Sequence, residues 1–305
     1  MRVFVAGGTG AVGGQAIPAL LREGHAVTAL ARTPEKAAAI TTHGAIPASV
    51  SLFDCSGLAA VFTGHDAVVN LATAIPPMSR WMSARAWRRN DQVRIEGSAA
   101  IVEAAVAAGV ERLVQESVSM LYHDQGARWV DENAPIDRYP MARANIAAEA
   151  NVDRFSESGG TGIVMRFGWF YGPGAAHSEQ LFALARRHLG LVLGPPDSYV
   201  SSIHVVDAGA AVAAALHAPA GTFNIVDDEP LTKGEYADAM ARAAGMAMWL
   251  RGPGRAASVF GDRLTSLTRS LRVSNARFRA ATGWAPRYPS AREGWIATAE
   301  ALKHC

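Results

Sequence analysis

The sequence contains few of the residues that mark several classes of protein. Only two of its 305 residues are cysteines, Cys55 and Cys305, and they lie far apart, so they suggest no disulfide framework. The nine histidines do not follow metal-ligand spacing, and we expect no metal site. Basic residues form no long run and the formal net charge is only +2, which gives no electrostatic case for binding nucleic acid or an anionic membrane.

Long apolar stretches are also missing. No apolar run approaches the roughly 18–20 residues that a membrane-spanning helix needs, and the first residues lack the apolar stretch of a signal peptide. We therefore expect a cytoplasmic protein that does not contact membranes. Hydrophobic residues make up 50% of the 305 positions and charged residues 18%. A chain of this length and composition can form the hydrophobic cores of a large α/β domain and a smaller second domain.

The most informative segment is a glycine-rich turn near the start of the chain. An apolar run at 3–5 predicts a strand, and apolar spacing over 16–21 predicts a helix. Between them lie Gly7, Gly10 and Gly13, where a tight turn lets a pyrophosphate approach backbone N–H groups at the helix N-terminus. This order predicts a dinucleotide-binding βαβ unit, and the alternative is a flavodoxin-like turn that binds no dinucleotide.

The end of the second predicted strand indicates which dinucleotide is bound. NAD-selective units place an acidic residue about 20 residues beyond the glycines, where it binds the ribose 2′-hydroxyl. This chain has Ala31 and Arg32 there, followed by Thr33 and, one helical turn later, Lys36. A guanidinium can pair with a 2′-phosphate that a carboxylate would repel. The sequence therefore favours NADP over NAD, unless Arg32 is only a solvated loop residue.

Strand and helix patterns alternate along the first half of the chain, which predicts a doubly wound parallel sheet of the Rossmann type. After residue 171 the alternation breaks, and a stretch rich in glycine and proline follows at 190–196. We predict a dinucleotide-binding domain at 1–172 plus about 200–226, and a smaller, discontinuous substrate domain at about 173–199 plus 227–305. The predicted strands are His25–Ala31, Ile46–Leu52, Ala67–Leu71, Arg112–Gln115 and Ile163–Phe167, and the main helices are Pro34–Thr41, Ser56–Phe62, Arg88–Ala108, Pro140–Glu157, Ser178–Leu189 and Thr232–Ala244.

Several of these segments resemble the extended short-chain dehydrogenase/reductase family, which includes NAD-dependent epimerases and dehydratases. The segment Thr9, Gly10, Ala11, Val12, Gly13 and Gly14 is similar to the family's nucleotide turn. The resemblance also covers 66–72, 166–173 and 283–286, so it spans nearly the whole chain. It implies that Leu71, Ala72 and Phe167 lie beside the cofactor. The helix after Asn90 resembles one that pairs subunits in the family, which implies a homodimer.

The resemblance is incomplete at the positions that would carry catalysis. The family's Tyr-x-x-x-Lys pair corresponds to Tyr139 and Arg143, and an arginine keeps the charge but cannot relay a proton. The usual catalytic serine or threonine falls on Val118, flanked by Ser117 and Ser119. Either a local distortion of the strand brings one of these serines into place, or the hydroxyl that binds the substrate is absent.

Together these features predict an NADP-dependent oxidoreductase, or an epimerase or dehydratase, acting on a small and largely apolar carbonyl or hydroxyl substrate. Tyr139 is the expected general acid, and Tyr122 is the alternative because it follows a predicted strand. His177 either faces the substrate or lies exposed in a loop. The rival interpretation is a catalytically impaired protein that binds NADPH and acts as a sensor or regulator, which the residues at 118 and 143 favour.

Overall fold

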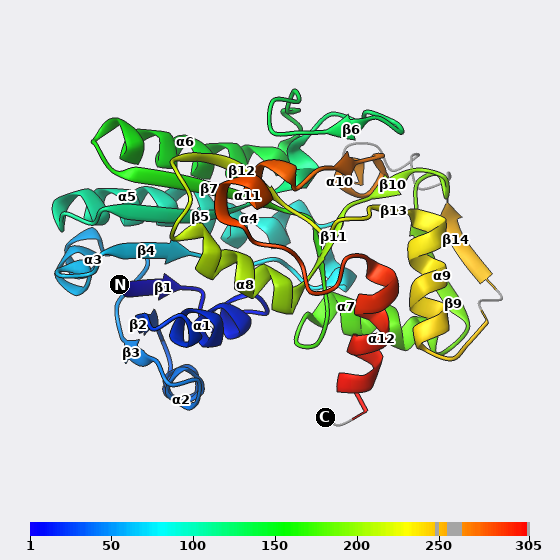
Figure 1. Ribbon diagram of the computed structural model, residues 1–305, viewed down its shortest axis with the longest axis horizontal. Helices are drawn as coiled ribbons and strands as arrows, with labels where there is room; N and C mark the ends of the chain where they lie inside the picture. Colours follow the sequence, from blue (N-terminus) through cyan, green and yellow to red (C-terminus); the bar gives the residue numbers. More distant parts are fainter. Residues whose placement is uncertain (248–249, 255–263, 304–305) are drawn as a thin grey trace.

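A computed structural model describes residues 1–247, 250–254 and 264–303, and Cys305 lies outside them. Its centre is a seven-stranded parallel sheet in the order β12-β7-β5-β4-β1-β2-β3 (Figure 1). The order runs outward in both directions from β1, which confirms the predicted doubly wound arrangement. The strands are β1 (Arg2–Ala6), β2 (Ala26–Leu30), β3 (Ile46–Ala48), β4 (Ala67–Asn70), β5 (Arg112–Val118), β7 (Thr161–Phe167) and β12 (Gly221–Ile225).

Helices cover both faces of this sheet, and the first strand shows why. Val3 and Val5 belong to one core cluster, whereas Phe4 and Ala6 belong to another, because alternate side chains of a strand point to opposite faces. The first cluster includes α1 (Gly13–Arg22) and α8 (Val205–Ala215), and the second includes α3 (Cys55–Phe62), α5 (Ser98–Ala107) and α6 (Arg143–Glu157). The helix α2 (Pro34–Thr42) follows β2.

Two predicted elements differ from the structure. The long helix predicted at Arg88–Ala108 is three consecutive pieces, α4 (Ala84–Gln92), a π-helical turn at Val93–Gly97 and α5. The helical spacing of the apolar residues in this segment predicts one buried stripe, formed by Ile95, Ile101, Val102, Ala105 and Val106. That prediction is wrong for Ile95 and Val106, which are 42% and 46% exposed. The helix predicted at Ser178–Leu189 ends at Ala185, and the glycine- and proline-rich stretch after it contains most of β9 (Leu189–Leu193), which pairs with β14 (Leu250–Gly254). A strand whose partner lies some sixty residues away leaves little local signal in the sequence.

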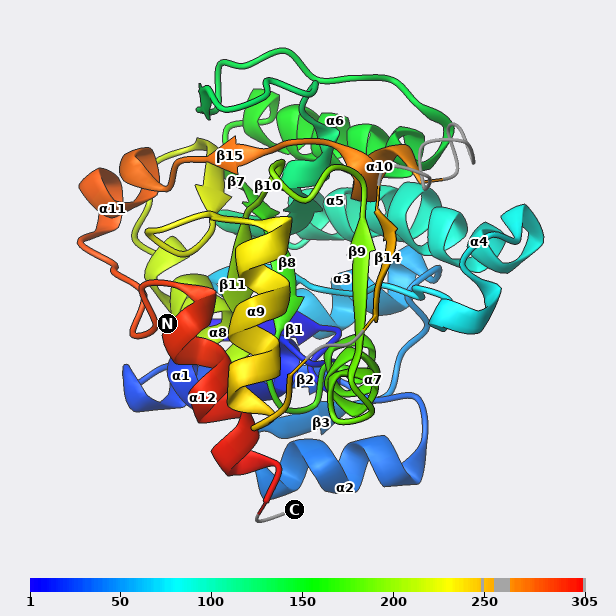
Figure 2. The same cartoon turned by 90° about the vertical axis from the view of Figure 1, so that its right-hand side faces the viewer.

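The later part of the chain gathers around a separate aromatic cluster. Trp295, Tyr171, Phe182 and Tyr236 pack together there, and the rings of Phe182 and Trp295 stack with centroids 5.8 Å apart. The elements involved are α7 (Ala176–Ala185), β9, α9 (Lys233–Ala243) and α12 (Ala291–Ala301) (Figure 2). Part of the segment after residue 227 packs instead on the sheet, because Phe278 of α11 (Ala276–Thr282) contacts Phe223 of β12. The proposed domain boundaries remain a prediction.

Short elements connect the two parts. They are β6 (Trp129–Val130), β8 (Trp169–Tyr171), β10 (Tyr199–Val200), β11 (Ser202–His204), β13 (Leu231–Thr232), α10 (Thr265–Thr268) and β15 (Arg272–Val273), with 3-10 turns at Met78–Arg80, Ser119–Leu121 and Pro140–Ala142. β11 pairs with β8, so the chain returns to the end of β7 before α8 begins. None of the described helices combines the length and the apolar character needed to cross a membrane.

Candidate active site

The glycine-rich turn has the close packing that a dinucleotide cradle requires. Gly7 has a φ of +85°, and a Cβ atom there would lie 2.5 Å from the carbonyl of Leu71. Gly13 is equally constrained, because its Cβ would lie 2.2 Å from the carbonyl oxygen of Gly7. The turn is closed by a 3.0 Å hydrogen bond that the N–H of Gly10 donates to the same oxygen. The structure therefore brings the turn against Leu71 and Ala72, and their place beside a cofactor stays a prediction.

The open side of this turn presents hydrogen-bond donors. Thr9 and Gly10 are exposed and Ala11 is half-buried, whereas Val12 is buried beneath them. Val12 is the residue before the first turn of α1, and its side chain makes no capping hydrogen bond there. The N–H groups of Gly14 and Gln15 donate to the carbonyls of Gly10 and Val12, and no side-chain cap covers this end of the helix, so an anion here would benefit from the helix dipole. These residues fit a pyrophosphate group.

The end of β2 is positively charged at the surface. Arg32 and Lys36 are both exposed, and the Thr33 hydroxyl accepts a 3.4 Å hydrogen bond from the N–H of Lys36 at the start of α2. The guanidinium of Arg32 and the ammonium of Lys36, one helical turn further on, therefore lie in solvent beside the carboxyl edge of the sheet. The arrangement suits a phosphate on the adenosine ribose.

A cavity of about 330 Å³ lies beyond the carboxyl ends of the strands. Its lining comes from segments that are distant in sequence, including the 3-10 turns at 78–80 and 119–121, β8, α7, β9, α9 and α10. The volume is that of a small-molecule site. The lining is mainly apolar, with Trp81 and Trp169 as aromatic walls, and its polar members include Ser119, Ser201, Ser266, Lys233 and Arg269.

Tyr139 lies directly behind this cavity. Its hydroxyl donates a 3.1 Å hydrogen bond to the carbonyl of Met120, and the side chain is buried. Burial raises the pKa of Tyr139 to about 12, while the charge of Arg269 and the Ser266 hydroxyl oppose that rise. Met120, Ser266 and Arg269 all line the cavity. The phenol therefore remains protonated at neutral pH at the cavity wall, which suits an acid more than a base.

The cation beside Tyr139 is Arg269, which sequence reasoning missed. Its guanidinium carbon lies 4.7 Å from the centre of the Tyr139 ring. It also forms an ion pair with Asp137 and donates a 2.7 Å hydrogen bond to the carbonyl of Tyr122. Arg143 is exposed at the start of α6, and the titrating group it influences is Asp91, whose pKa it lowers against the larger effect of burial. No motif links 139 to 269, so local spacing gave no signal for this contact.

Ser117 and Ser119 lie in different surroundings. β5 ends at Val118 and a 3-10 turn begins at Ser119, and this change of direction places Ser119 on the cavity. Ser117 is fully buried within the strand and donates a 2.6 Å hydrogen bond to Oε1 of Glu149. The strand thus runs three residues beyond its predicted end, and the 3-10 turn after it brings Ser119 to the cavity while Ser117 stays in the strand.

Tyr122, the alternative acid, is part of a buried polar network away from the cavity lining. It is fully buried, and its hydroxyl donates a 2.8 Å hydrogen bond to Asn224. Arg166 lies over its ring at 5.0 Å and binds Glu149 through two hydrogen bonds of 2.8 and 2.6 Å. Burial raises the pKa of Tyr122 to about 12. Asn224, Arg166 and Glu149 do not line the cavity, whereas the partners of Tyr139 do, so we assign Tyr122 to the stability of this layer of the fold.

Two further residues named from the sequence have clear positions. Phe167 is fully buried at the end of β7, where its ring lies 5.1 Å from that of Phe170. His177 is not an exposed loop residue. It lines the cavity beside Trp169, its Nε2 lies 2.7 Å from the carbonyl oxygen of Phe170, and burial lowers its pKa.

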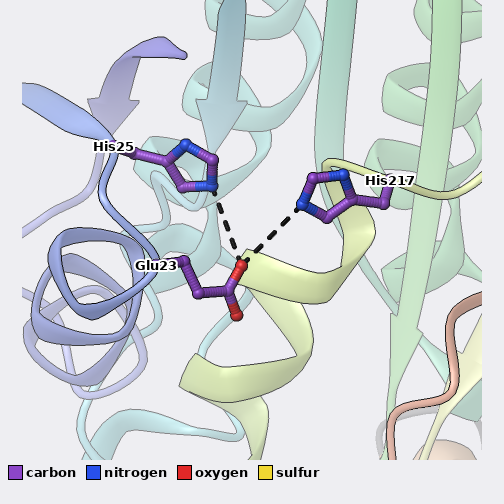
Figure 3. A group of neighbouring side chains, drawn as sticks. All are labelled: Glu23, His25 and His217. Carbon is purple, nitrogen blue, oxygen red and sulfur yellow. Dashed lines mark ion pairs between the residues drawn. The ribbon is translucent and has the colours of Figure 1, made fainter.

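A group of possible metal ligands lies at the other end of the sheet. Glu23, His25 and His217 offer ligand atoms within 4.8 Å of one another, and the Glu23 carboxylate lies 3.7 and 3.9 Å from the two imidazoles (Figure 3). His25 is buried, and burial together with the amino-terminal charge lowers its pKa. His25 directly precedes β2, so this group lies at the amino ends of the strands and takes no part in the cavity.

Comparisons with known proteins agree with this geometry. Residues 3–225 match the model of the NAD dependent epimerase/dehydratase family. A Streptomyces protein named 3-diazoavenalumate denitrifying reductase is 34% identical over 96% of this chain and 99% of its own length. A Mycobacterium tuberculosis 3 beta-hydroxysteroid dehydrogenase/Delta 5-->4-isomerase is 27% identical over 80% of this chain and 70% of its own.

Solved structures show the same fold. A Thermus thermophilus UDP-glucose 4-epimerase complexed with NAD superposes with a TM-score of 0.81 at 24% identity, over 99% of both chains. A human epimerase family protein with NADPH superposes with a TM-score of 0.80 at 23% identity, over 98% of this chain and 99% of its own. The relatives by sequence are a reductase and a dehydrogenase, and the family model covers the sheet and its cradle. This chain belongs to the NAD-dependent epimerase/dehydratase family, and its class is that of NAD(P)-dependent oxidoreductases and epimerases.

Proposed function

We propose that this protein is an NADP-dependent reductase of a small, largely apolar substrate. The cavity carries the proposal, because its lining is mainly apolar and includes Ser119 and Met120, and the Met120 carbonyl accepts a hydrogen bond from the buried Tyr139 behind it. Similarity to a reductase at 34% identity supports reduction over epimerisation. A nucleotide sugar is disfavoured because its two phosphates need several cations, and the described lining has only Lys233 and Arg269.

We assign a separate role in the proposed reduction to each residue of the cradle and the cavity. Bound in the glycine cradle, NADPH would supply hydride to the substrate. Arg32 would pair with its 2′-phosphate, and the N–H groups of the glycine turn at the start of α1 would hold its pyrophosphate. Ser119 donates a hydrogen bond to the acceptor oxygen of a carbonyl, and Tyr139 gives it a proton, which yields the alcohol. Arg269, whose guanidinium lies beside the Tyr139 ring, would stabilise the tyrosinate left behind until a proton from solvent restores the phenol.

The cofactor part is tested by calorimetric titration of nucleotide-free protein with NADPH, NADP, NADH and NAD. We expect tighter binding of the two phosphorylated forms. Arg32→Ala removes a charge-assisted pair worth about 1.5–3 kcal/mol, so it lowers NADPH affinity by roughly 10- to 150-fold and leaves NADH unchanged. The matched control is Arg22→Ala at the far end of α1. Equal binding of all four nucleotides by the unaltered protein contradicts the proposed cofactor.

The catalytic part is tested by NADPH oxidation with a panel of aromatic aldehydes and ketones. Tyr139→Phe removes the acid, and we expect a fall in kcat of about 10²–10⁴ with unchanged NADPH affinity. Tyr122→Phe serves as the control, because its hydroxyl is bound to Asn224 in the buried network. If turnover persists in Tyr139→Phe, this tyrosine is not the acid.

One observation favours the rival function, an NADPH-binding sensor without turnover. Arg143 is exposed, and Val118 occupies the usual place of a catalytic hydroxyl, so two of the family's catalytic positions are changed. The sensor predicts tight NADPH binding with no oxidation by any member of the carbonyl panel. The reductase predicts turnover that depends on Ser119 and Tyr139.

The exposed side of the α4–α5 segment supports a homodimer. Ile95 and Val106 are large apolar residues that are 42% and 46% exposed on this segment, where family resemblance implies subunit pairing. Exposed apolar side chains on one helical layer suit an isologous interface. Light scattering after size exclusion is expected to give the mass of two chains, and Ile95→Glu to give that of one. A monomer at working concentration contradicts this proposal.

A further inference from the structure

We propose that the cavity selects substrates with a flat apolar body and an acidic group, and that Lys233 binds the acid. This inference rests on the proposed function, since it names the substrate class of the same cavity. Three observations support it: the cavity has aromatic and aliphatic walls, its lining carries cations but no carboxylate among the described residues, and Lys233 is buried without an ion-pair partner.

The walls suit a flat apolar molecule. Trp81 and Trp169 lie with ring centroids 6.4 Å apart, and Trp87 packs edge-on against Trp81 at 4.7 Å. The opposite walls are formed by leucine side chains of β9 and of the segment 264–271. Aromatic and aliphatic surfaces of this kind bind planar hydrophobic groups through their faces. The body of the ligand is thus apolar, and the polar groups of the lining determine what else it carries.

The lining has hydrogen-bond donors and positive charge but no negative charge among the described residues. Lys233 and Arg269 line the cavity and no aspartate or glutamate does. The Nε1 atom of Trp81, which can only donate, is buried without a hydrogen-bond partner. Arg269 is already engaged by Asp137 and by the carbonyl of Tyr122. The available charge is therefore that of Lys233, and its complement is an anion.

Lys233 is held in an unusual position for a lysine. It is the first residue of α9, it is only 9% exposed, and its Nζ donates a 2.9 Å hydrogen bond to the carbonyl of Leu267. Two of the three ammonium protons are left, and no carboxylate among the described residues lies within ion-pair distance of Nζ. A buried and unpaired cation is costly, and one that lines a cavity is a functional candidate.

The groups around Lys233 define its expected titration. Burial lowers the pKa of Lys233 to about 8, and the negative charge of Asp124 opposes this fall in pKa. Asp124 is exposed, and its carboxylate accepts hydrogen bonds from the N–H groups of Gly126 and Ser270. The other charged or titratable residues of the lining are His177, Tyr199, Tyr236 and Arg269. Burial lowers the pKa of His177 and raises that of Tyr236, so neither gains a charge between pH 7 and 9.

The experiment compares naphthoate with naphthamide, which share a flat body and differ in charge. Binding is measured by calorimetry and by quenching of tryptophan fluorescence, with and without saturating NADP. We expect naphthoate to bind at least tenfold more tightly than naphthamide at pH 7. Its affinity falls above pH 8 as Lys233 loses its proton, while that of naphthamide stays constant.

Two variants separate binding from folding. Lys233→Gln keeps a donor for the carbonyl of Leu267, and Lys233→Met removes it together with the charge. Both are expected to reduce naphthoate affinity by about 10- to 150-fold, to leave naphthamide unchanged and to abolish the pH dependence. The control is Lys303→Met, an exposed position after α12 that belongs to neither the cradle nor the cavity, and we expect it to leave the affinity of both probes unchanged.

The outcomes are distinct from those of the proposed function. Equal binding of both probes, no binding of either, or unchanged naphthoate binding in Lys233→Gln overturns the proposal, even where NADPH binds and carbonyls are reduced. Selective, Lys233-dependent binding of naphthoate supports it even where no nucleotide binds, and in that case the reductase assignment fails alone.

Discussion

His204 offers a quantitative test of how burial in this fold controls a charge. It is 2% exposed at the start of α8, where its Nδ1 accepts a 3.3 Å hydrogen bond from the N–H of Val206. Its ring lies against Tyr171 and Tyr288, at centroid distances of 5.3 and 4.4 Å. Burial, with a smaller effect of Arg287, lowers the pKa of His204 from 6.5 to about 4. The imidazole is therefore neutral in the folded protein at pH 7.

The sign of the effect on stability follows from linkage. The unfolded chain binds a proton at His204 near pH 6.5 and the folded chain only near pH 4, so acidification favours unfolding across that interval. One pKa unit corresponds to about 1.36 kcal/mol, so the full loss is about 3 kcal/mol. At pH 5.5 the two titrations give a loss of about 1.4 kcal/mol relative to neutral pH. Above pH 6.5 the contribution is fully present.

Urea unfolding at pH 7.5 and pH 5.5 measures this loss in the unaltered protein and in His204→Asn. Asparagine keeps an acceptor for the N–H of Val206, so the variant preserves the helix cap while it removes the titrating ring. His25, His65 and His177 also have pKa values lowered by burial, but they are present in both proteins and cancel in the difference.

We expect acidification to cost the unaltered protein about 1.4 kcal/mol more than His204→Asn. The variant itself is less stable at pH 7.5 by about 1–3 kcal/mol, because it loses ring contacts with its neighbours. His43→Asn, at an exposed position, is expected to respond to acid like the unaltered protein. If the losses of His204→Asn and the unaltered protein agree within about 0.3 kcal/mol, burial does not keep this imidazole neutral.

Three further predictions concern the cradle, the two serines and the buried ion pair of Glu149 and Arg166. Gly13→Ala places a Cβ 2.2 Å from the carbonyl oxygen of Gly7, so we expect it to lower the free energy of unfolding by about 1–3 kcal/mol and to remove most NADPH binding. Gly14→Ala is the control, because a Cβ there has no neighbour within 4 Å, and we expect it to keep both stability and NADPH binding. Ser119→Ala is expected to lower kcat/KM about tenfold without loss of stability, and Ser117→Ala to cost about 1–3 kcal/mol in urea unfolding without loss of turnover. Glu149→Gln leaves Arg166 buried without its counter-charge and is expected to cost about 3–5 kcal/mol, and a loss below 1 kcal/mol contradicts this.

The sequence predicted the parts of this structure that depend on neighbouring residues. The glycine turn, β2 and α2 are found where expected, because short-range periodicity and the demands of a tight turn determine them. β9 was missed because its partner β14 lies far along the chain. The apolar stripe assigned to the long helix included Ile95 wrongly, since the π-helical turn at 93–97 shifts the helical register there.

The candidate site was predictable only in part, for the same reason. The glycine cradle comes from one local motif, whereas the surroundings of Tyr139 come from three segments. Arg269 reaches its ring from a distant part of the chain, and no spacing rule relates the two positions. Lys233 was also missed, because an isolated lysine in the first turn of a helix is normally solvated, and only the fold shows that this one is buried.

The position of Arg269 has a consequence for how this protein can change its substrate. In a Tyr-x-x-x-Lys site, one helical face holds both the acid and its cation, so the substrate domain can vary without disturbing proton transfer. In this chain the cation beside Tyr139 comes from the segment that also contributes Ser266 and Leu267 to the cavity. A change that reshapes this wall therefore also moves the charge that opposes the rise in the pKa of Tyr139. Selectivity and proton transfer are thus coupled, and substitutions in 264–271 are expected to alter KM and kcat together.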